Sequence, residues 1–253
     1  KEINHQKGGS LNTRVVKVLN NVTKIIANSE YTKNLAINNG VIKEKVKVIN
    51  PGVNPAKELN KKSLEKVESL LKTKTPRLIT VSRFDKRKNH EKVIMALRNL
   101  KQIYPDIVYI CIGYGDEEKS LKKLVEELNL GSQVMFFKDI TDDLKNSLIA
   151  KSHIFVMPSI IHKKSVEGFG IAYVEAAQYG VPSLGGKDGG ASDAIEHDRT
   201  GLICDGNNLD DIYSSLNSMI ENKKYFELGR NAKEYVTKFK WEKIIEEYKK
   251  FLQ

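Results

Sequence analysis

Short apolar runs of four or five residues alternate along the chain with longer amphipathic stretches. Runs of this length predict buried strands, and the stretches between them carry apolar residues at helical spacing. Strands that alternate with helices indicate a parallel sheet with helices on both faces, a doubly wound, Rossmann-like α/β architecture. The predicted strands are residues 23–27, 46–49, 78–82, 108–112, 134–137, 153–157 and 200–203.

A segment rich in proline and glycine, residues 50–55, interrupts this alternation. Two prolines and one glycine in six residues mark a linker. We therefore expect residues 1–50 to be the end of one α/β domain, residues 51–56 the linker, and residues 57–240 a larger α/β domain. The final segment, residues 241–253, has an apolar stripe at helical spacing, which predicts a helix that packs on another part of the chain.

The composition limits the partners that the chain can have. Its 253 residues are 40% hydrophobic and 29% charged, which is typical of a globular protein, and no apolar run reaches membrane-spanning length. Cys111 and Cys204 lie in apolar runs, so we expect core thiols and a reducing cytoplasm. The net charge of +10 suits nucleic acid, an anionic membrane surface or a polyphosphate ligand. Since no nucleic-acid-binding motif accompanies it, we expect no nucleic acid and leave peripheral contact with the inner face of the membrane open.

Residues 165–182 carry the strongest chemical signal. Glu167 precedes a Gly-Phe-Gly turn, which leads into a helix that is apolar except for Glu175. A glycine-ended loop before a helix presents free backbone N–H groups to an anion such as phosphate. A carboxylate on an apolar helix must find hydrogen-bond donors or lose its charge, and a sugar diol offers two adjacent donors. Solvent exposure of Glu175, or pairing with a Lys or Arg elsewhere, explains the pattern equally well.

A basic loop follows the predicted strand 78–82. Arg83 and Lys88 lie on this loop, where a strand of an α/β sheet ends and ligands commonly bind. Arg can bind a phosphate with two hydrogen bonds, and Lys supplies a point charge. A basic loop by itself is more often a solvated surface. The turn at Gly113 is equally ambiguous, because a tight strand-to-helix turn also needs glycine.

Two glutamates eight residues apart around Gly-Phe-Gly, followed by Gly-Val-Pro, resemble the E-x7-E signature of retaining glycosyltransferases of the GT-B fold. The resemblance is to family 4, the glycosyl transferases group 1. It covers almost the whole chain and is strongest between residues 82 and 193. It implies a complete nucleotide-sugar donor domain and the last part of an acceptor-side domain, with residues 241–253 crossing back to that part.

The resemblance also implies an activity: retaining transfer of a hexose-type sugar from a UDP- or GDP-linked donor to a hydroxyl of a glycan or lipid-linked acceptor, in bacterial cell-surface glycan or glycolipid synthesis. Glu167 would orient the sugar, and Glu175 would bind the ribose. Arg83 and Lys88 would offset the charge of the leaving diphosphate, so no metal ion and no other cofactor is expected. Here Ser82 replaces the family's glycine, and Asp193 its later glutamate. Further donor contacts are predicted for Gly168, Phe169, Gly170, Ile171, Gly113, Lys138 and Asp139.

Two other hypotheses stay open. The same kind of donor domain occurs in nucleotide-sugar 2-epimerases, which catalyse a different reaction. Alternatively the chain, which lacks an initiator methionine, is a donor-binding fragment without catalysis. The base, the sugar and the acceptor depend on the shape of the pocket, which the sequence does not reveal. His5 is left without a role.

Overall fold

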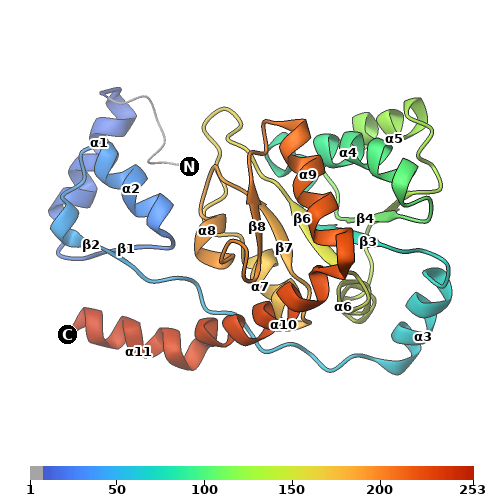
Figure 1. Ribbon diagram of the computed structural model, residues 1–253. Helices are drawn as coiled ribbons and strands as arrows, with labels where there is room; N and C mark the ends of the chain where they lie inside the picture. The colour runs from blue at the N-terminus through green and yellow to red at the C-terminus, as the bar shows by residue number, and fades with distance from the viewer. Residues whose placement is uncertain (1–7) are drawn as a thin grey trace.

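A six-stranded parallel sheet forms the centre of the computed structural model (Figure 1). The structure describes residues 8–253, and residues 1–7, which include His5, lie outside the described residues. The strand order is β5-β4-β3-β6-β7-β8, and every neighbouring pair is parallel. This confirms the predicted α/β class with a Rossmann-like sheet. The strands are β3 (Arg77–Val81), β4 (Val108–Ile112), β5 (Val134–Phe137), β6 (Ile154–Met157), β7 (Ser183–Gly186) and β8 (Gly201–Cys204).

Helices cover both faces of this sheet because side chains along each strand point alternately to opposite faces. Leu78 of β3 belongs to the apolar cluster on one face, and Ile79 belongs to the cluster on the other. The helices of the first face are α4 (His90–Ile103), α5 (Glu118–Glu127) and α9 (Leu209–Ile220). Those of the second face are α3 (Lys61–Leu70), α6 (Asp142–Ala150), α7 (Ile171–Gln178) and part of α10 (Tyr225–Tyr235).

A second, two-stranded parallel sheet lies in the N-terminal part of the chain. Its strands are β1 (Ile25–Ala27) and β2 (Val46–Val48), with helices α1 (Ser10–Asn21) and α2 (Glu30–Asn38) beside them. The short elements that complete the chain are α8 (Ala191–Ala194) and the 3-10 turns Lys43–Lys45, Lys86–Lys88, Glu221–Lys223 and Val236–Phe239.

The C-terminal helix α11 (Trp241–Leu252) runs back beside the N-terminal part, as Figure 1 shows. The Lys24 ammonium donates a hydrogen bond to the carbonyl oxygen of Phe251 and lies 5.4 Å from the centre of its ring. Lys47 approaches the same ring from 5.3 Å. At the other end of the helix, the Trp241 ring packs directly on the backbone of Gly52 in the linker. The helix thus contacts both the linker and the smaller sheet.

The N-terminal ends of two helices differ from expectation. The sequence predicts Asp142 as the N-cap of α6, but the Thr141 hydroxyl has that role and accepts a 3.3 Å hydrogen bond from the backbone of the first turn. The sequence also predicts Asn89 as a capping side chain for α4. Asn89 instead has a left-handed backbone with φ 64°, and its side chain donates to the carbonyl oxygens of Pro158 and Gly206. Asparagine is one of the few non-glycine residues that adopt this conformation readily.

Both cysteines lie inside the large sheet, Cys111 in β4 and Cys204 in β8. They are free and buried, which confirms the prediction of core thiols. Burial raises the pKa of both, that of Cys204 to about 12, because a thiolate is unfavourable among apolar side chains. Both thiols are therefore protonated at neutral pH.

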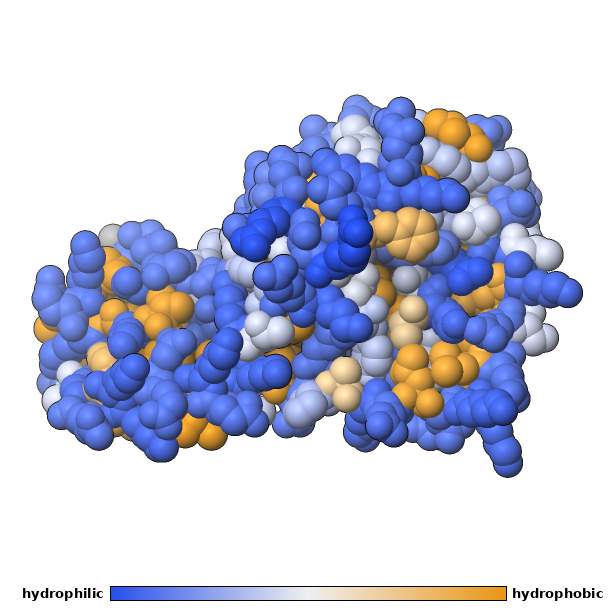
Figure 2. Space-filling model, turned by 60° about the horizontal axis from the view of Figure 1, so that its bottom comes forward, coloured by the Kyte–Doolittle hydropathy of each residue, from blue (hydrophilic) through white to orange (hydrophobic). Residues whose placement is uncertain are grey.

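Figure 2 shows a face on which hydrophilic residues predominate and hydrophobic residues form separate patches. Within residues 8–253, no helix is both long enough and apolar enough to cross a membrane.

Candidate functional site

The carboxyl ends of the six parallel strands meet at one edge of the large sheet, which is the edge where α/β proteins bind ligands. The predicted site residues of the large sheet lie on the loops that leave this edge or on α7, the helix that one of them enters. The loops concerned are residues 82–89 after β3, 113–117 after β4, 138–141 after β5 and 158–170 after β6.

Two of these loops meet in a largely buried ion cluster. Glu167 lies between Arg87 and Lys88, and its Oε2 atom is 2.5 Å from Arg87 Nη1 and 2.5 Å from Lys88 Nζ. The exposed fractions of the three side chains are 13%, 9% and 12% respectively. The structure thus brings together Glu167 and Lys88, both predicted site residues. Arg87 was not predicted.

The charges of this cluster are not balanced. Burial by itself would raise the pKa of Glu167, but Lys88 and then Arg87 hold that pKa below its ordinary value. Glu167 is therefore an anion at neutral pH. The pKa of Lys88 is also lowered, because burial and the neighbouring Arg87 outweigh the attraction of Glu167. Two cations share one carboxylate, and an additional anion would stabilise the charged form of Lys88.

Arg83 lies apart from this cluster. Its side chain is 73% exposed and forms a 3.4 Å ion pair with Asp85. The same Asp85 carboxylate is 3.8 Å from Arg87 and accepts a 3.2 Å hydrogen bond from the backbone N–H of Lys88. Asp85 therefore links the exposed and buried cations of the loop. The role predicted for Arg83 at the diphosphate remains a prediction.

The Gly-Phe-Gly turn requires glycine at its last position for steric reasons. Gly170 has φ 88° at the N-cap of α7, and a Cβ there would overlap the ring of Tyr173. A Cβ on Gly168 would lie 2.9 Å from the side-chain Nδ2 atom of Asn28, which belongs to the N-terminal part. Phe169 is buried and packs edge-on in the core. Phe169 thus anchors the turn between two glycines that let other groups approach the backbone closely.

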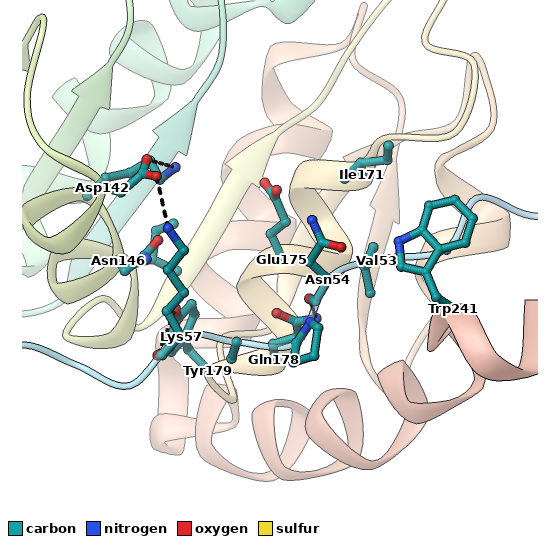
Figure 3. A pocket seen from close by; sticks show the side chains of 15 residues that line it. Val53, Asn54, Lys57, Asp142, Asn146, Ile171, Glu175, Gln178, Tyr179 and Trp241 are labelled. Atoms are coloured by element: carbon teal, nitrogen blue, oxygen red, sulfur yellow. Dashed lines mark hydrogen bonds and ion pairs between the residues drawn. The ribbon is translucent and has the colours of Figure 1, made fainter.

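Glu175 projects into a cavity of about 370 Å³, which Figure 3 shows from close by. The cavity lies between α6, α7, the linker and Trp241, and Ile171 forms part of its wall. The sequence left open whether Glu175 is buried or exposed, and in the structure the side of α7 that carries Glu175 and Ile171 is exposed. The linker and α6 stand away from α7 here, so the side chain reaches solvent.

The electrostatic surroundings of Glu175 disfavour its charge. The walls of the cavity desolvate its carboxylate and raise its pKa, and Asp142 on α6 adds to the effect, whereas Lys145 opposes it. Asp142 is already paired with two cations, Lys57 just after the linker and Lys145 from its own helix, at 3.3 and 2.8 Å. Glu175 is therefore an acceptor that faces the cavity, beside cations that are engaged by another carboxylate.

The remaining predicted contacts lie on the next two loops. Gly113 has φ 144°, and a Cβ there would overlap the carbonyl oxygen of Ser82, so packing alone explains its glycine. Lys138 and Asp139 are exposed, and the Lys138 ammonium lies 5.8 Å from the centre of the Tyr114 ring. None of the three lines the cavity around Glu175. Their roles as donor contacts stay predictions.

The N-terminal part of the chain packs on the glycine-rich loops. Asp193 of α8 accepts a 3.0 Å hydrogen bond from the backbone N–H of Glu30 at the start of α2, and a 3.1 Å hydrogen bond from the Asn50 side chain. The Thr32 hydroxyl donates to the carbonyl oxygen of Gly168 at 3.4 Å. The N-terminal part therefore contacts both α8 and the turn that begins α7.

Comparison with characterised families gives this geometry a context. The family model described as glycosyl transferases group 1 matches residues 61–239. A GDP-mannose-dependent alpha-(1-6)-phosphatidylinositol monomannoside mannosyltransferase of Mycobacterium tuberculosis is 26% identical over 182 residues, which are 70% of this chain and 47% of that protein. The N-acetyl-alpha-D-glucosaminyl L-malate synthase of Bacillus anthracis is 27% identical over 173 residues, 68% of this chain and 43% of the relative. The chain thus spans about half the length of these curated relatives.

Solved structures share the fold. The Anabaena protein Alr3699/HepE, solved in complex with UDP, is 24% identical with a TM-score of 0.86, over 99% of this chain and 70% of that one. A glycosyltransferase from Rickettsia africae is 22% identical with a TM-score of 0.79, over 94% of this chain and 66% of that one. At these identities the structures support the GT-B fold. Together with the family match over most of its length, they show that this chain belongs to the glycosyl transferases group 1 family.

Proposed function

We propose that the chain binds a nucleoside diphosphate sugar at the carboxyl edge of its large sheet and takes part in retaining transfer of the sugar to a hydroxyl acceptor. The observation that carries this proposal is the pairing of Glu167 with two cations beside the glycine turn that begins α7. A diphosphate needs positive charge and backbone N–H groups, and both occur here.

The residues divide the work of the reaction. Lys88, assisted by Arg83, would stabilise the negative charge that grows on the leaving diphosphate, and the N-terminus of α7 would add its dipole. Glu167 would orient the sugar, and Glu175 would accept hydrogen bonds from the ribose hydroxyls. In this proposal no metal ion is needed, since protein cations and helix N–H groups offset the charge.

The relatives support a choice of donor and acceptor. The mycobacterial relative is named for GDP-mannose and a phosphatidylinositol monomannoside, and the Anabaena neighbour was solved with UDP. We therefore propose a UDP- or GDP-linked hexose donor and a glycan or lipid-linked acceptor, in bacterial cell-surface glycan or glycolipid synthesis. A lipid-linked acceptor would bring the protein to the inner face of the membrane as a peripheral protein.

Two measurements test the proposal in sequence. Calorimetry with UDP and GDP on this chain should show saturable binding of at least one of them. Radiolabelled UDP-glucose and GDP-mannose, with a bacterial lipid extract as acceptor, should then give a labelled product whose anomeric configuration matches the donor. Binding of neither nucleotide would contradict the proposal. Conversion of the donor to its 2-epimer, without transfer, would support an epimerase of the same fold.

A further inference from the structure

Arg87 occupies an unusual position for an arginine. Among residues 8–253, it is more buried than any other Lys, Arg, Asp or Glu. Its Nη1 atom contacts Glu167, its Nη2 atom lies 3.8 Å from Asp85, and its Nε atom is buried without a hydrogen-bond partner among the described residues. Its carbonyl oxygen accepts a 2.9 Å hydrogen bond from the backbone N–H of Ile160, which fixes it against the loop after β6.

Lys88 is held less firmly. Besides Glu167 and a hydrogen bond from its backbone N–H to Asp85, its ammonium contacts the sulfur of Met157 at 3.4 Å, and a thioether is a weak acceptor. A lysine ammonium on its flexible stem can turn between partners, whereas the guanidinium of Arg87 is held at two corners. Of the two cations on Glu167, Lys88 is therefore the one that can move toward a new anion.

Building on the proposed function, we propose that Arg87 is a positioning residue that keeps Glu167 paired and oriented while Lys88 turns from Glu167 to the donor diphosphate. Without Arg87, the same movement would leave a buried carboxylate without a cation, which is strongly unfavourable. Lys88 would then remain on Glu167, and the diphosphate would lose its contact. Arg87 thus affects nucleotide binding through Glu167 and does not contact the nucleotide itself.

A double-mutant cycle tests this coupling. Calorimetry with UDP and GDP is run on the unmodified chain, Arg87→Gln, Glu167→Gln and the double variant. Arg98→Gln, at an exposed position on α4, is the matched control for removing an arginine charge. Arg87→Gln should weaken binding by about tenfold, and Arg87→Lys should restore much of it, because contacting charges typically couple by this order. Glu167→Gln should bind as well as the unmodified chain or better, since Lys88 is released.

The double-mutant cycle distinguishes an effect of Arg87 through Glu167 from a direct contact between Arg87 and the nucleotide. If Arg87 acts through Glu167, adding Arg87→Gln to Glu167→Gln should change affinity by less than about threefold. Equal losses in both backgrounds would show that Arg87 contacts the nucleotide directly and would overturn the inference. Unchanged affinity in Arg87→Gln would also overturn it. Thermal melts identify a folding defect, in which case the same cycle is run with Arg87→Met, which also removes the charge but suits the buried position better than glutamine. Failure of the unmodified chain to bind either nucleotide would refute the proposed function itself.

Discussion

Replacing Asn89 should lower the free energy of unfolding, because this side chain ties the cation-bearing loop to the loops that follow β6 and β8. Its Nδ2 atom donates to the carbonyl oxygen of Pro158 at 2.9 Å and to that of Gly206 at 2.8 Å, and both bonds are buried. Pro158 follows β6, and Gly206 lies just beyond the end of β8. The two bonds therefore hold the end of the loop at the carboxyl edge of the sheet.

Glycine and alanine at position 89 separate the contribution of the side-chain hydrogen bonds from that of the left-handed backbone. Glycine at position 89 removes both hydrogen bonds but tolerates the left-handed backbone, so at about 0.5–1.5 kcal/mol for each bond we expect a loss of about 1–3 kcal/mol. Alanine removes the same bonds and adds the strain of a left-handed conformation, about 1–2 kcal/mol more. Asn89→Ala should therefore be the more destabilised variant.

Asn129 provides a matched control. It also has a left-handed backbone, with φ 55°, but it is exposed and its side chain makes no hydrogen bond within residues 8–253. Glycine increases the conformational entropy of the unfolded chain by the same amount at position 89 and at position 129, so this effect cancels in the comparison. Urea unfolding followed by circular dichroism should therefore show Asn89→Gly less stable than Asn129→Gly by about 1–3 kcal/mol. Equal stabilities of the two glycine variants would refute the reasoning.

Three further predictions concern the proposed donor site. Lys88→Ala and Arg83→Ala should each weaken UDP or GDP binding by about 1.5–3 kcal/mol in calorimetry, and only the buried Lys88→Ala should also lower the melting temperature; unchanged affinity in both would remove the diphosphate role. Nucleotide affinity should fall as the pH drops below neutral, because the raised pKa of Glu175 lets this acceptor protonate earlier than an ordinary glutamate, and Glu175→Gln should flatten that part of the profile. Gly52→Ala should displace the ring of Trp241, the single tryptophan, and shift its fluorescence emission; an unchanged spectrum would contradict the packing.

The strands of the large sheet could be predicted from the sequence because helices bury both faces of each. Such strands become uniformly apolar runs, and residues 108–112 form β4 as predicted, all of them buried. Helix starts were harder to predict. A residue type that can cap a helix can also form hydrogen bonds elsewhere, and two such residues often stand side by side in the sequence. Asn89 uses its side chain for distant carbonyls, and at α6 Thr141 rather than the neighbouring Asp142 accepts the capping bond. Those choices depend on tertiary neighbours.

The site was predicted only where local sequence constrains it. The glycine turn before α7 and its Glu167 are signals of this kind, and the structure places Lys88 against Glu167. Arg87 gave no comparable signal, since it is the middle residue of three consecutive cations. The 3-10 turn over Lys86–Lys88 turns Arg87 and Lys88 inward and leaves Lys86 exposed, and this depends on the Asp85 side chain that caps the turn. The sequence left the exposure of Glu175 open for a related reason, because the surroundings of that side of α7 depend on where the linker runs.

The net charge of +10 says little about this site. Charges on exposed helices are screened beyond about 8–10 Å at physiological ionic strength, so most of that excess does not act on a bound ligand. Within the ion-paired network at this edge of the sheet, Arg83, Arg87 and Lys88 face Asp85 and Glu167, so three cations against two carboxylates leave one positive charge in the network. Most of this local excess lies on side chains with little exposure to solvent, where screening is weak. It is the burial of these few groups, rather than the total charge, that favours binding of a diphosphate here.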